Sequence, residues 1–266
     1  MDLKEISNFI TSSAKSLNIK KWDFGASFSN DFSVQVDKGI AKQLKASQKQ
    51  VLTLRVWNKK NLVGITTTSD LSENGLKKAL YQANLASDYG NKNELTDFSP
   101  LAKDPIKDIK QAKRSPAGIK KLLETLRFAE SELLKKHSAI KTIPYNGLSE
   151  SFYKRIYANS EGAQRSYAKS QAAIYLYARA EENNRKPRSS GSVKIGYGLE
   201  DIDINSCIDE AAEKTISHLN YSAIETGKYK VCFSPESFLT LMNAFSSIFN
   251  ARSIIDGVSI SNKDSI

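Results

Sequence analysis

The chain has 266 residues, of which 40% are hydrophobic and 26% charged, and its formal net charge is +10. These values are ordinary for a soluble globular protein with one large domain or two modest ones. No segment approaches the roughly 20 consecutive apolar residues of a membrane span, and the N-terminus MDLKEISNFI lacks the apolar core of a signal peptide. The composition therefore excludes a membrane-spanning protein and predicts a cytoplasmic one.

Residues 1–89 are predicted to form an N-terminal α+β lobe. Asp2 followed by Glu5 resembles a capping box at the start of a helix. Apolar periodicity predicts these elements: a helix over 3–17, a hairpin over 22–36 that turns at Ser29-Asn30-Asp31, a hairpin of 51–57 with 62–68, and a helix over 76–86. Residues 90–116 are polar and contain three prolines, which is typical of a linker.

Residues 117–225 are predicted to form a second α+β lobe around a long hairpin. Its expected elements are a helix over 119–133, strands over 140–158 and 165–180 joined by the turn Asn159-Ser160-Glu161-Gly162, a short strand over 189–198, and a helix over 207–219. Because the strands come mostly as hairpins with helices between them, we expect an α+β fold with antiparallel sheets and packed helices in two lobes.

Residues 226–266 begin with a predicted strand, 229–233, which runs into a helix. Ser234 is a good N-cap and Pro235 fits the first helical position. Phe238, Met242, Phe245 and Phe249 then recur at helical spacing up to residue 250. Two cysteines form no disulfide framework; Cys207 on a helix face and Cys232 in the strand are expected to be buried free thiols of a reducing compartment.

Four sequence features together resemble the TldD/PmbA family, the two-subunit peptidases also called modulators of DNA gyrase. They are the segment VLTLRVWNKKNLVGITTTSDL at 51–71, the alanine-containing helix 76–86, the Asn-Ser-x-Gly turn at 159–162, and Thr226-Gly227-Lys228-Tyr229. The resemblance makes residues 226–266 the start of the family's strand-rich C-terminal domain, of which the rest is almost wholly missing. The resemblance therefore implies a fragment, a truncated product or a natural short form.

The resemblance also implies which subunit the chain represents. In the family's catalytic subunit, the helix that corresponds to 235–250 carries a His-Glu-x-x-x-His metal motif, whereas this helix has no histidine. The chain thus resembles the PmbA (TldE) subunit, which lacks the metal. This resemblance implies that the chain has no catalytic residue, no metal ligand and no cofactor. It implies zinc only in a TldD-type partner, and peptide hydrolysis by the complex of the two subunits.

The residues themselves also argue against a metal site in this chain. A zinc peptidase needs two neutral imidazoles one helical turn apart, a third ligand and a carboxylate that activates water. The only histidines are His137 and His218, and neither has a His or Cys three or four residues away. No nucleophile elbow is present, and the glycines at 191–198 fit no phosphate-binding loop.

The resemblance assigns candidate site residues near a peptide-binding chamber: Asn159, Ser160, Gly162, Thr226, Gly227 and Tyr229. The first three are equally the residues of an ordinary hairpin turn, with Gly162 at positive φ. Tyrosines at 153, 157, 167, 175 and 177 could line a peptide groove or form a half-buried sheet face. Both interpretations remain open from the sequence.

The net positive charge raises the alternative of a nucleic-acid partner. The lysines at 38, 42, 45 and 49 and those at 103–113 are scattered along the sequence, so a basic solvated surface is favoured and nucleic-acid binding is unlikely. Two alternatives to a peptidase subunit remain. One is a non-enzymatic regulator associated with nucleic acid, which a concentrated basic face would favour, and the other is an inactive truncated remnant.

Overall fold

The computed structural model of the protein describes residues 2–90, 98–105 and 114–261. Parts of the predicted linker, residues 91–97 and 106–113, lie outside the described residues. The chain divides into two compact units, Met1–Tyr221 and Ser222–Ile266.

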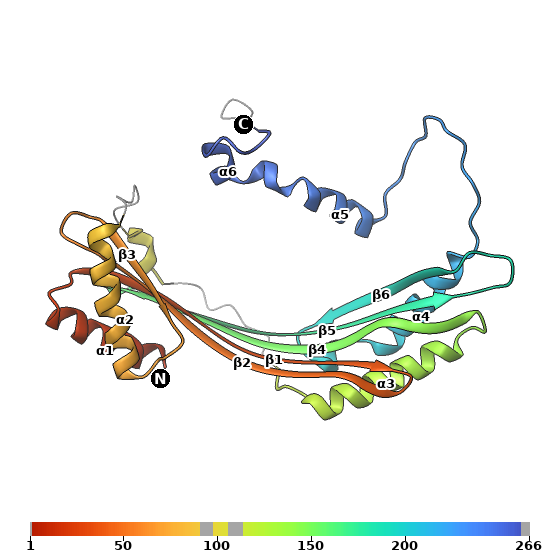
Figure 1. The fold of residues 1–266 in the computed structure, drawn as a ribbon, viewed down its shortest axis with the longest axis horizontal. Helices are drawn as coiled ribbons and strands as arrows, with labels where there is room; N and C mark the ends of the chain where they lie inside the picture. The colour runs from red at the N-terminus through yellow and green to blue at the C-terminus, as the bar shows by residue number, and fades with distance from the viewer. Residues whose placement is uncertain (1, 91–97, 106–113, 262–266) are drawn as a thin grey trace. The chain divides into compact units, whose positions relative to one another are not determined.

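The described residues of the larger unit form one antiparallel sheet (Figure 1). Its strands are β1 (Lys21–Asp37), β2 (Ile40–Trp57), β3 (Val63–Thr68), β4 (Ile140–Asn159), β5 (Gln164–Ala180) and β6 (Arg188–Gly196). They lie in the order β3-β2-β1-β4-β5-β6, and every neighbouring pair is antiparallel. The prediction of an α+β fold with antiparallel sheets is confirmed.

Strand β1 is continuous, so the turn predicted at Ser29-Asn30-Asp31 is wrong. Ser29 pairs with Lys49 of β2 on one side and with Tyr153 of β4 on the other. Ladders on both sides over this length outweigh the local turn preference of Ser, Asn and Asp, because strand propensity depends strongly on tertiary context. The chain instead reverses at Lys38 and Gly39, both at positive φ.

The predicted hairpin of 51–57 with 62–68 is confirmed, because β2 pairs with β3 from Leu52 opposite Thr68 to Trp57 opposite Val63. The Asn58 side chain holds its turn by accepting the N–H groups of Lys60 and Leu62 at 2.9 and 3.1 Å. Residues 40–51 of β2, which precede Leu52, pair with β1 and have no strand partner on their other side among the described residues.

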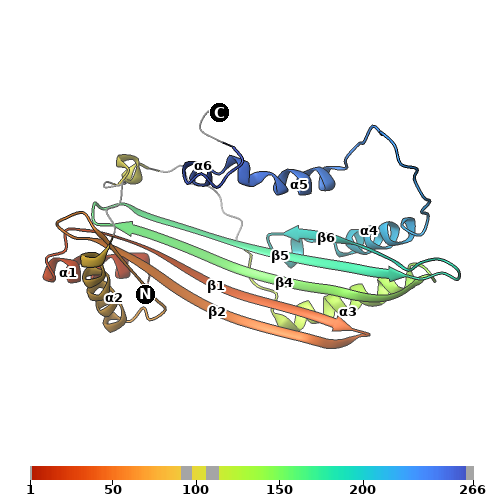
Figure 2. The same cartoon turned by 45° about the horizontal axis from the view of Figure 1, so that its top comes forward.

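Two pairs of helices cover the two ends of the sheet (Figures 1 and 2). One end carries α1 (Leu3–Ser16) and α2 (Glu73–Ala86), and the other carries α3 (Ile119–Lys135) and α4 (Ile204–Ser217). Side-chain caps begin three of them: the Asp2–Glu5 capping box, Ser72 and Asp203. Among the described residues, no helix has the length and apolar character needed to cross a membrane.

Each helix pair has its own hydrophobic cluster, and strands β1 and β4 contribute to both. Phe24 and Ile156 lie in the cluster of α1 and α2, whereas Val34 and Leu148 lie in that of α3 and α4. The regions predicted as the first two lobes are therefore built on the same sheet. Helix α3 also binds the β1–β2 turn, since the buried Glu130 carboxylate accepts the N–H groups of Lys38 and Gly39.

The smaller unit contains α5 (Pro235–Ala244), a 3₁₀ turn over Ser246–Phe249 and α6 (Ala251–Ile255). Ser234 caps α5 and Pro235 stands in its first turn, as predicted. The predicted helix to residue 250 is wrong in its extent, because the backbone tightens to 3₁₀ geometry after Phe245. The apolar stripe of α5 is exposed, with Phe238 and Phe245 showing 49% and 47% of their surfaces.

Candidate functional site: the open sheet face and the turn at residue 159

The larger unit's sheet has one face that the helices cover and one that they leave open. Strand β5 shows this division as a period of two: its even-numbered residues from Ala168 to Ala180 are buried, and its odd-numbered residues from Tyr167 to Arg179 are exposed or half-buried. All the helix contacts of the two clusters involve the even-numbered side. We call the odd-numbered residues of β1, β2 from 43, β4 from 145, β5 and β6 the open face.

The predicted turn at 159–162 lies at one end of this sheet. The Asn159 N–H donates to the Ala163 carbonyl at 3.1 Å, and the Asn159 side-chain oxygen accepts the N–H groups of Glu161 and Ala163 at 3.1 and 3.0 Å. Gly162 has φ +91°, a conformation that favours glycine. The hairpin-turn geometry predicted for these residues is therefore confirmed, and their role in a peptide chamber stays a prediction.

Ser160 ties this turn to the start of β1. The Trp22 N–H donates to the Ser160 hydroxyl at 3.2 Å, and the Ser160 N–H donates to the Trp22 carbonyl at 2.9 Å. This reciprocal pair of hydrogen bonds continues the β1–β4 ladder beyond Asp23 and Asn159. Asn159 and Ser160 thus fix the end of the sheet through their own polar groups, which is a structural reason for an Asn-Ser-x-Gly sequence here.

A buried ion pair adjoins the turn on the open face. The Asp23 side chain is only 2% exposed, and it accepts hydrogen bonds from two nitrogens of Arg55, the Nε contact being 2.8 Å. The Tyr157 hydroxyl approaches Asp23 Oδ2 at 3.3 Å, and Asn159 approaches that hydroxyl at 3.4 Å. These four residues form the turn cluster, in which the charge of Asp23 is matched by Arg55.

The turn cluster shifts the titration of its members away from neutral pH. Hydrogen bonding to Asp23 raises the pKa of Arg55, and burial is the largest cause that raises the pKa of Tyr157. Both groups therefore keep their neutral-pH charge states, Arg55 positive and Tyr157 neutral. Arg55 and Tyr157 can therefore hold a polar contact in place through their hydrogen bonds to Asp23.

The segment before residue 105 covers this end of the open face. Phe98 meets Trp57 edge-on with ring centroids 5.4 Å apart, and the Lys21 ammonium lies 5.3 Å from the Phe98 centroid. Arg165 donates to the Asp104 carbonyl at 2.7 Å. Residues 98–105 of the predicted linker thus pack beside the turn cluster. Among the described residues, no such segment covers the middle of the open face.

Tyrosines line the open face farther along β4 and β5. Tyr167 is 47% exposed. The Tyr175 ring lies across Gly147, where an added Cβ would come within 2.5 Å of the ring, and the Tyr175 hydroxyl accepts from Gln35 at 2.8 Å. The predicted tyrosine set therefore lies on the half-exposed side of the sheet rather than in the core.

Basic side chains gather in the middle of the same face. Lys49, Ser29, Tyr153 and Lys169 are successive partners across β2, β1, β4 and β5. Arg155 stands on the next row, and its guanidinium lies 5.0 Å from the Tyr153 ring centroid and bonds to the Tyr153 hydroxyl. Lysines that are scattered in the sequence are thus brought to one surface.

The remaining predicted site residues, Thr226, Gly227 and Tyr229, lie in the smaller unit. The Tyr229 hydroxyl donates to the Glu225 carbonyl at 2.8 Å, and the Tyr229 ring stands over Gly227. The strand predicted at 229–233 is wrong, since these residues have no strand pairing among the described residues. Cys232 is consequently exposed, against the prediction that it is buried.

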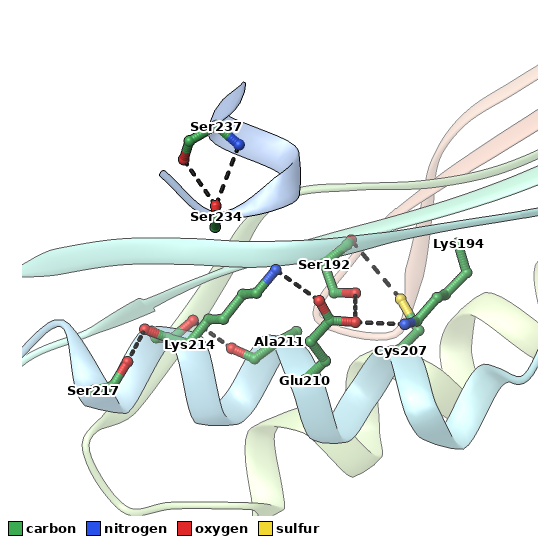
Figure 3. Close-up of polar contacts among 10 residues, drawn as sticks. Ser192, Lys194, Cys207, Glu210, Ala211, Lys214, Ser217, Ser234 and Ser237 are labelled. Carbon is green, nitrogen blue, oxygen red and sulfur yellow. Dashed lines mark hydrogen bonds and ion pairs between the residues drawn. The ribbon is translucent and has the colours of Figure 1, made fainter. Parts of the chain in front are cut away.

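A second polar cluster lies between α4 and β6 (Figure 3). Glu210 contacts Lys194 and Lys214 at 2.5 and 2.6 Å and accepts from the Ser192 hydroxyl at 2.9 Å. These hydrogen bonds lower the pKa of Glu210 from 4.5 to about 2. Cys207 beside it is buried, as predicted, and burial raises the pKa of its thiol, so this cluster joins a helix to a strand and holds no reactive thiolate.

The two histidines end helices, as expected. His137 follows α3 and its Nδ1 accepts the Ala139 N–H at 3.0 Å, and His218 is the C-cap of α4. Among residues 2–90, 98–105 and 114–261, no group of three or more His, Cys, Asp or Glu side chains could hold a metal ion. No described residues therefore supply a zinc site.

Sequence reasoning missed the Asp23–Arg55 pair and the basic row. Arg55 and Asp23 face each other only because β1 and β2 pair over their full length, and the predicted reversal at 29–31 placed β1 in a different hairpin. The alternation in 21–37 and 43–57 was the available signal, since it assigns Asp23, Arg55 and Lys49 to one face once the two strands are paired.

Comparison with known proteins identifies the class of this fold. Residues 112–219 match the model of a metallopeptidase central domain, that of PmbA/TldA. Residues 112–219 thus match the central domain of the TldD/PmbA family, in agreement with the resemblance that the sequence motifs indicated. No curated protein matches the sequence.

Three solved structures share the fold. A candidate modulator of DNA gyrase from Bacteroides thetaiotaomicron is 14% identical with a TM-score of 0.79, and the match covers 94% of this chain and 58% of that one. A candidate modulator of DNA gyrase from Thermotoga maritima is 16% identical with a TM-score of 0.71, and the match covers 85% of this chain and 50% of that one. TldE from Thermococcus kodakarensis is 16% identical with a TM-score of 0.64, and the match covers 79% of this chain and 47% of that one. The chain thus spans about half the length of these structures.

Proposed function

We propose that this protein is the PmbA/TldE-type, non-metal subunit of a cytoplasmic metallopeptidase complex. In this proposal a TldD-type subunit supplies the zinc, and the pair hydrolyses unfolded or small peptides, including modified peptide precursors. The observation that carries the proposal is the central domain at 112–219 followed by a helix, α5, without a histidine. The likeness to a TldE structure supports the same assignment.

The division of labour follows from the chemistry that zinc hydrolysis needs. Water activation requires metal ligands and a carboxylate base, and this sequence offers two histidines at the ends of separate helices. The chain's own contribution is then to bind and orient peptide. An open sheet face with tyrosines and cationic side chains suits that role, because aromatic rings give large contact area at low entropic cost.

The free side of β2 offers a second way to hold a peptide backbone. Within the part of the chain that the structure describes, residues 40–51 pair with β1 alone, so their outward N–H and C=O groups are open to an added strand. Lys42, Lys45 and Lys49 along this edge discourage pairing with another copy of the same edge, since like charges would be brought together. A peptide of opposite charge does not meet that obstacle.

One structural observation favours a second candidate, a regulator associated with nucleic acid. The basic row at Lys49 and Lys169 is more concentrated in space than along the sequence. Proteins that bind single-stranded nucleic acid combine such cations with aromatic rings that stack on bases. The candidate modulators of DNA gyrase among the similar structures carry a name consistent with that role.

Co-purification from the native host, followed by metal analysis, tests the proposal. We expect a TldD-type partner chain to co-elute and about one zinc to be present in the complex, with the isolated chain binding none stoichiometrically. A substitution in the chain, His218→Ala, should leave the metal content of the complex unchanged. Stoichiometric zinc on the isolated chain that is lost in His218→Ala, or nucleic acid in place of a protein partner, would overturn the assignment.

A further inference from the structure

We infer that the middle of the open face binds an extended acidic peptide, with carboxylates four residues apart engaging Lys49 and Lys169. This inference deepens the proposed function by naming the charge and the spacing of its peptide. It rests on the proposal that the ligand is a peptide, and on the geometry of one row of residues that crosses four strands.

The row has a fixed geometry. Lys49, Ser29, Tyr153 and Lys169 are consecutive cross-strand partners in the order β2-β1-β4-β5. Three interstrand spacings of about 4.8 Å place the two lysine backbones about 14 Å apart. In an extended peptide that crosses the strands, residues i and i+4 are about 13 Å apart and point to the same side. Acidic side chains at those positions therefore match both lysines at once.

The charges on this part of the face are uncompensated. Among the described residues, Lys45, Lys49 and Lys169 form no ion pair, in contrast to Arg55, which is neutralised by Asp23. Asp31, opposite Ser47 and Ser151, is the acidic residue of the neighbouring row. The surface thus favours a ligand with carboxylates.

The aromatic rings favour a peptide over a nucleic acid. The Arg155 guanidinium bonds to the Tyr153 hydroxyl, and the Tyr175 ring packs against Gly147 with its hydroxyl held by Gln35. Neither ring is presented as a free platform for base stacking. Between the two lysines lie Ser29 and Tyr153, and Val51 in the neighbouring row, 41% exposed, adds apolar surface beside Lys49.

Fluorescence anisotropy with the isolated chain tests the inference. Two labelled, unstructured peptides of identical composition would be compared, one with Glu at i and i+4 and the other with Glu at i and i+3, where the side chains point to opposite sides. We expect the first to bind severalfold more tightly and to weaken as salt is raised, since exposed charges are screened. Lys49→Glu should weaken its binding about tenfold.

Lys59→Glu is the matched control, because it makes the same change of charge in the 58–61 turn, away from the row. It should leave binding within about twofold, and both variants should keep the thermal midpoint of the wild type. Equal binding of the two peptides, equal loss in the two variants, or tighter binding of oligothymidylate than of the acidic peptide would overturn the inference. Because no partner or cleavage enters this assay, its failure is separate from failure of the partnership tested by co-purification.

Discussion

The two faces of the same strands differ in what their side chains do. From Ala172 to Ala178, the even-numbered residues of β5 are apolar members of the cluster of α3 and α4, whereas its odd-numbered face carries Tyr167, Lys169, Tyr175 and Arg179. One set fixes the fold and the other leaves a patterned, basic surface for which the core has no need. The comparison teaches that stability and binding can be altered independently on alternate residues of one strand.

The largest effect is expected on the covered face. Ile174→Ala removes a fully buried side chain from the cluster of α3 and α4, and we expect the free energy of unfolding to fall by about 2–4 kcal/mol. The matched truncation on the other side, Val193→Ala, should cost less than about 1 kcal/mol, because Val193 is half exposed. Chemical denaturation measures both. Similar losses in the two variants would remove the distinction between the faces.

The next effect concerns the turn cluster, the place where the open face is buried. Asp23→Asn keeps the shape of the side chain but removes the charge that holds Arg55 and meets Tyr157. We expect a loss of about 1–3 kcal/mol, because charge-assisted hydrogen bonds to a buried carboxylate are broken. Asp31→Asn, on the same strand and part-buried with one Ser29 contact, should cost less than about 0.5 kcal/mol. Urea melts that rank Asp31 above Asp23 would contradict the buried-pair description.

A smaller effect is expected where the open face packs on itself. Gly147→Ala forces the Tyr175 ring off its position and breaks the Gln35 contact, so a loss of about 1 kcal/mol is expected from overpacking. Gly25→Ala, on the same face with nothing within 4 Å of an added Cβ, should be neutral or slightly stabilising. Denaturant midpoints for the pair decide whether the ring is held as described.

The smallest effect depends on pH and lies beneath β6. Because the pKa of Glu210 is lowered from 4.5 to about 2, its contribution to stability is present above pH 4.5 and is lost as pH falls towards 2. We expect Glu210→Gln to cost about 0.5–1 kcal/mol at pH 7, with the difference from wild type vanishing near pH 2. Glu213→Gln, an exposed residue of the same helix, is the control. A pH-independent difference between Glu210→Gln and wild type would show that the ion pairs are not its cause.

Local pattern was sufficient for most of the fold. Capping at Asp2 and Ser234, the apolar periodicity of the helices and the alternation in 165–180 are encoded by residues close in sequence, and they predicted the helices and the long hairpin. The turn at 29–31 was mispredicted because the decisive interactions are ladders on both sides, to the following strand β2 and to β4, which is distant in sequence. The strand at 229–233 failed for the converse reason, because an apolar alternation becomes a strand only beside a partner.

The candidate site was only half visible in the sequence. The 159–162 turn is local, so its glycine and asparagine predicted its geometry. The Asp23–Arg55 pair and the row from Lys49 to Lys169 arise from registers between strands up to about 120 residues apart in sequence. Scattered lysines therefore looked like a solvated surface until the strand order placed them together.

The most direct test of the proposed role is peptide cleavage measured on three samples: this chain, the host's TldD-type protein, and their mixture. The account predicts background cleavage by this chain alone and chelator-sensitive cleavage by the mixture. Lys49→Glu in this chain should slow cleavage of an acidic peptide by the mixture and leave that of a neutral peptide unchanged. Robust chelator-sensitive cleavage by the isolated chain would contradict its assignment as the non-metal subunit.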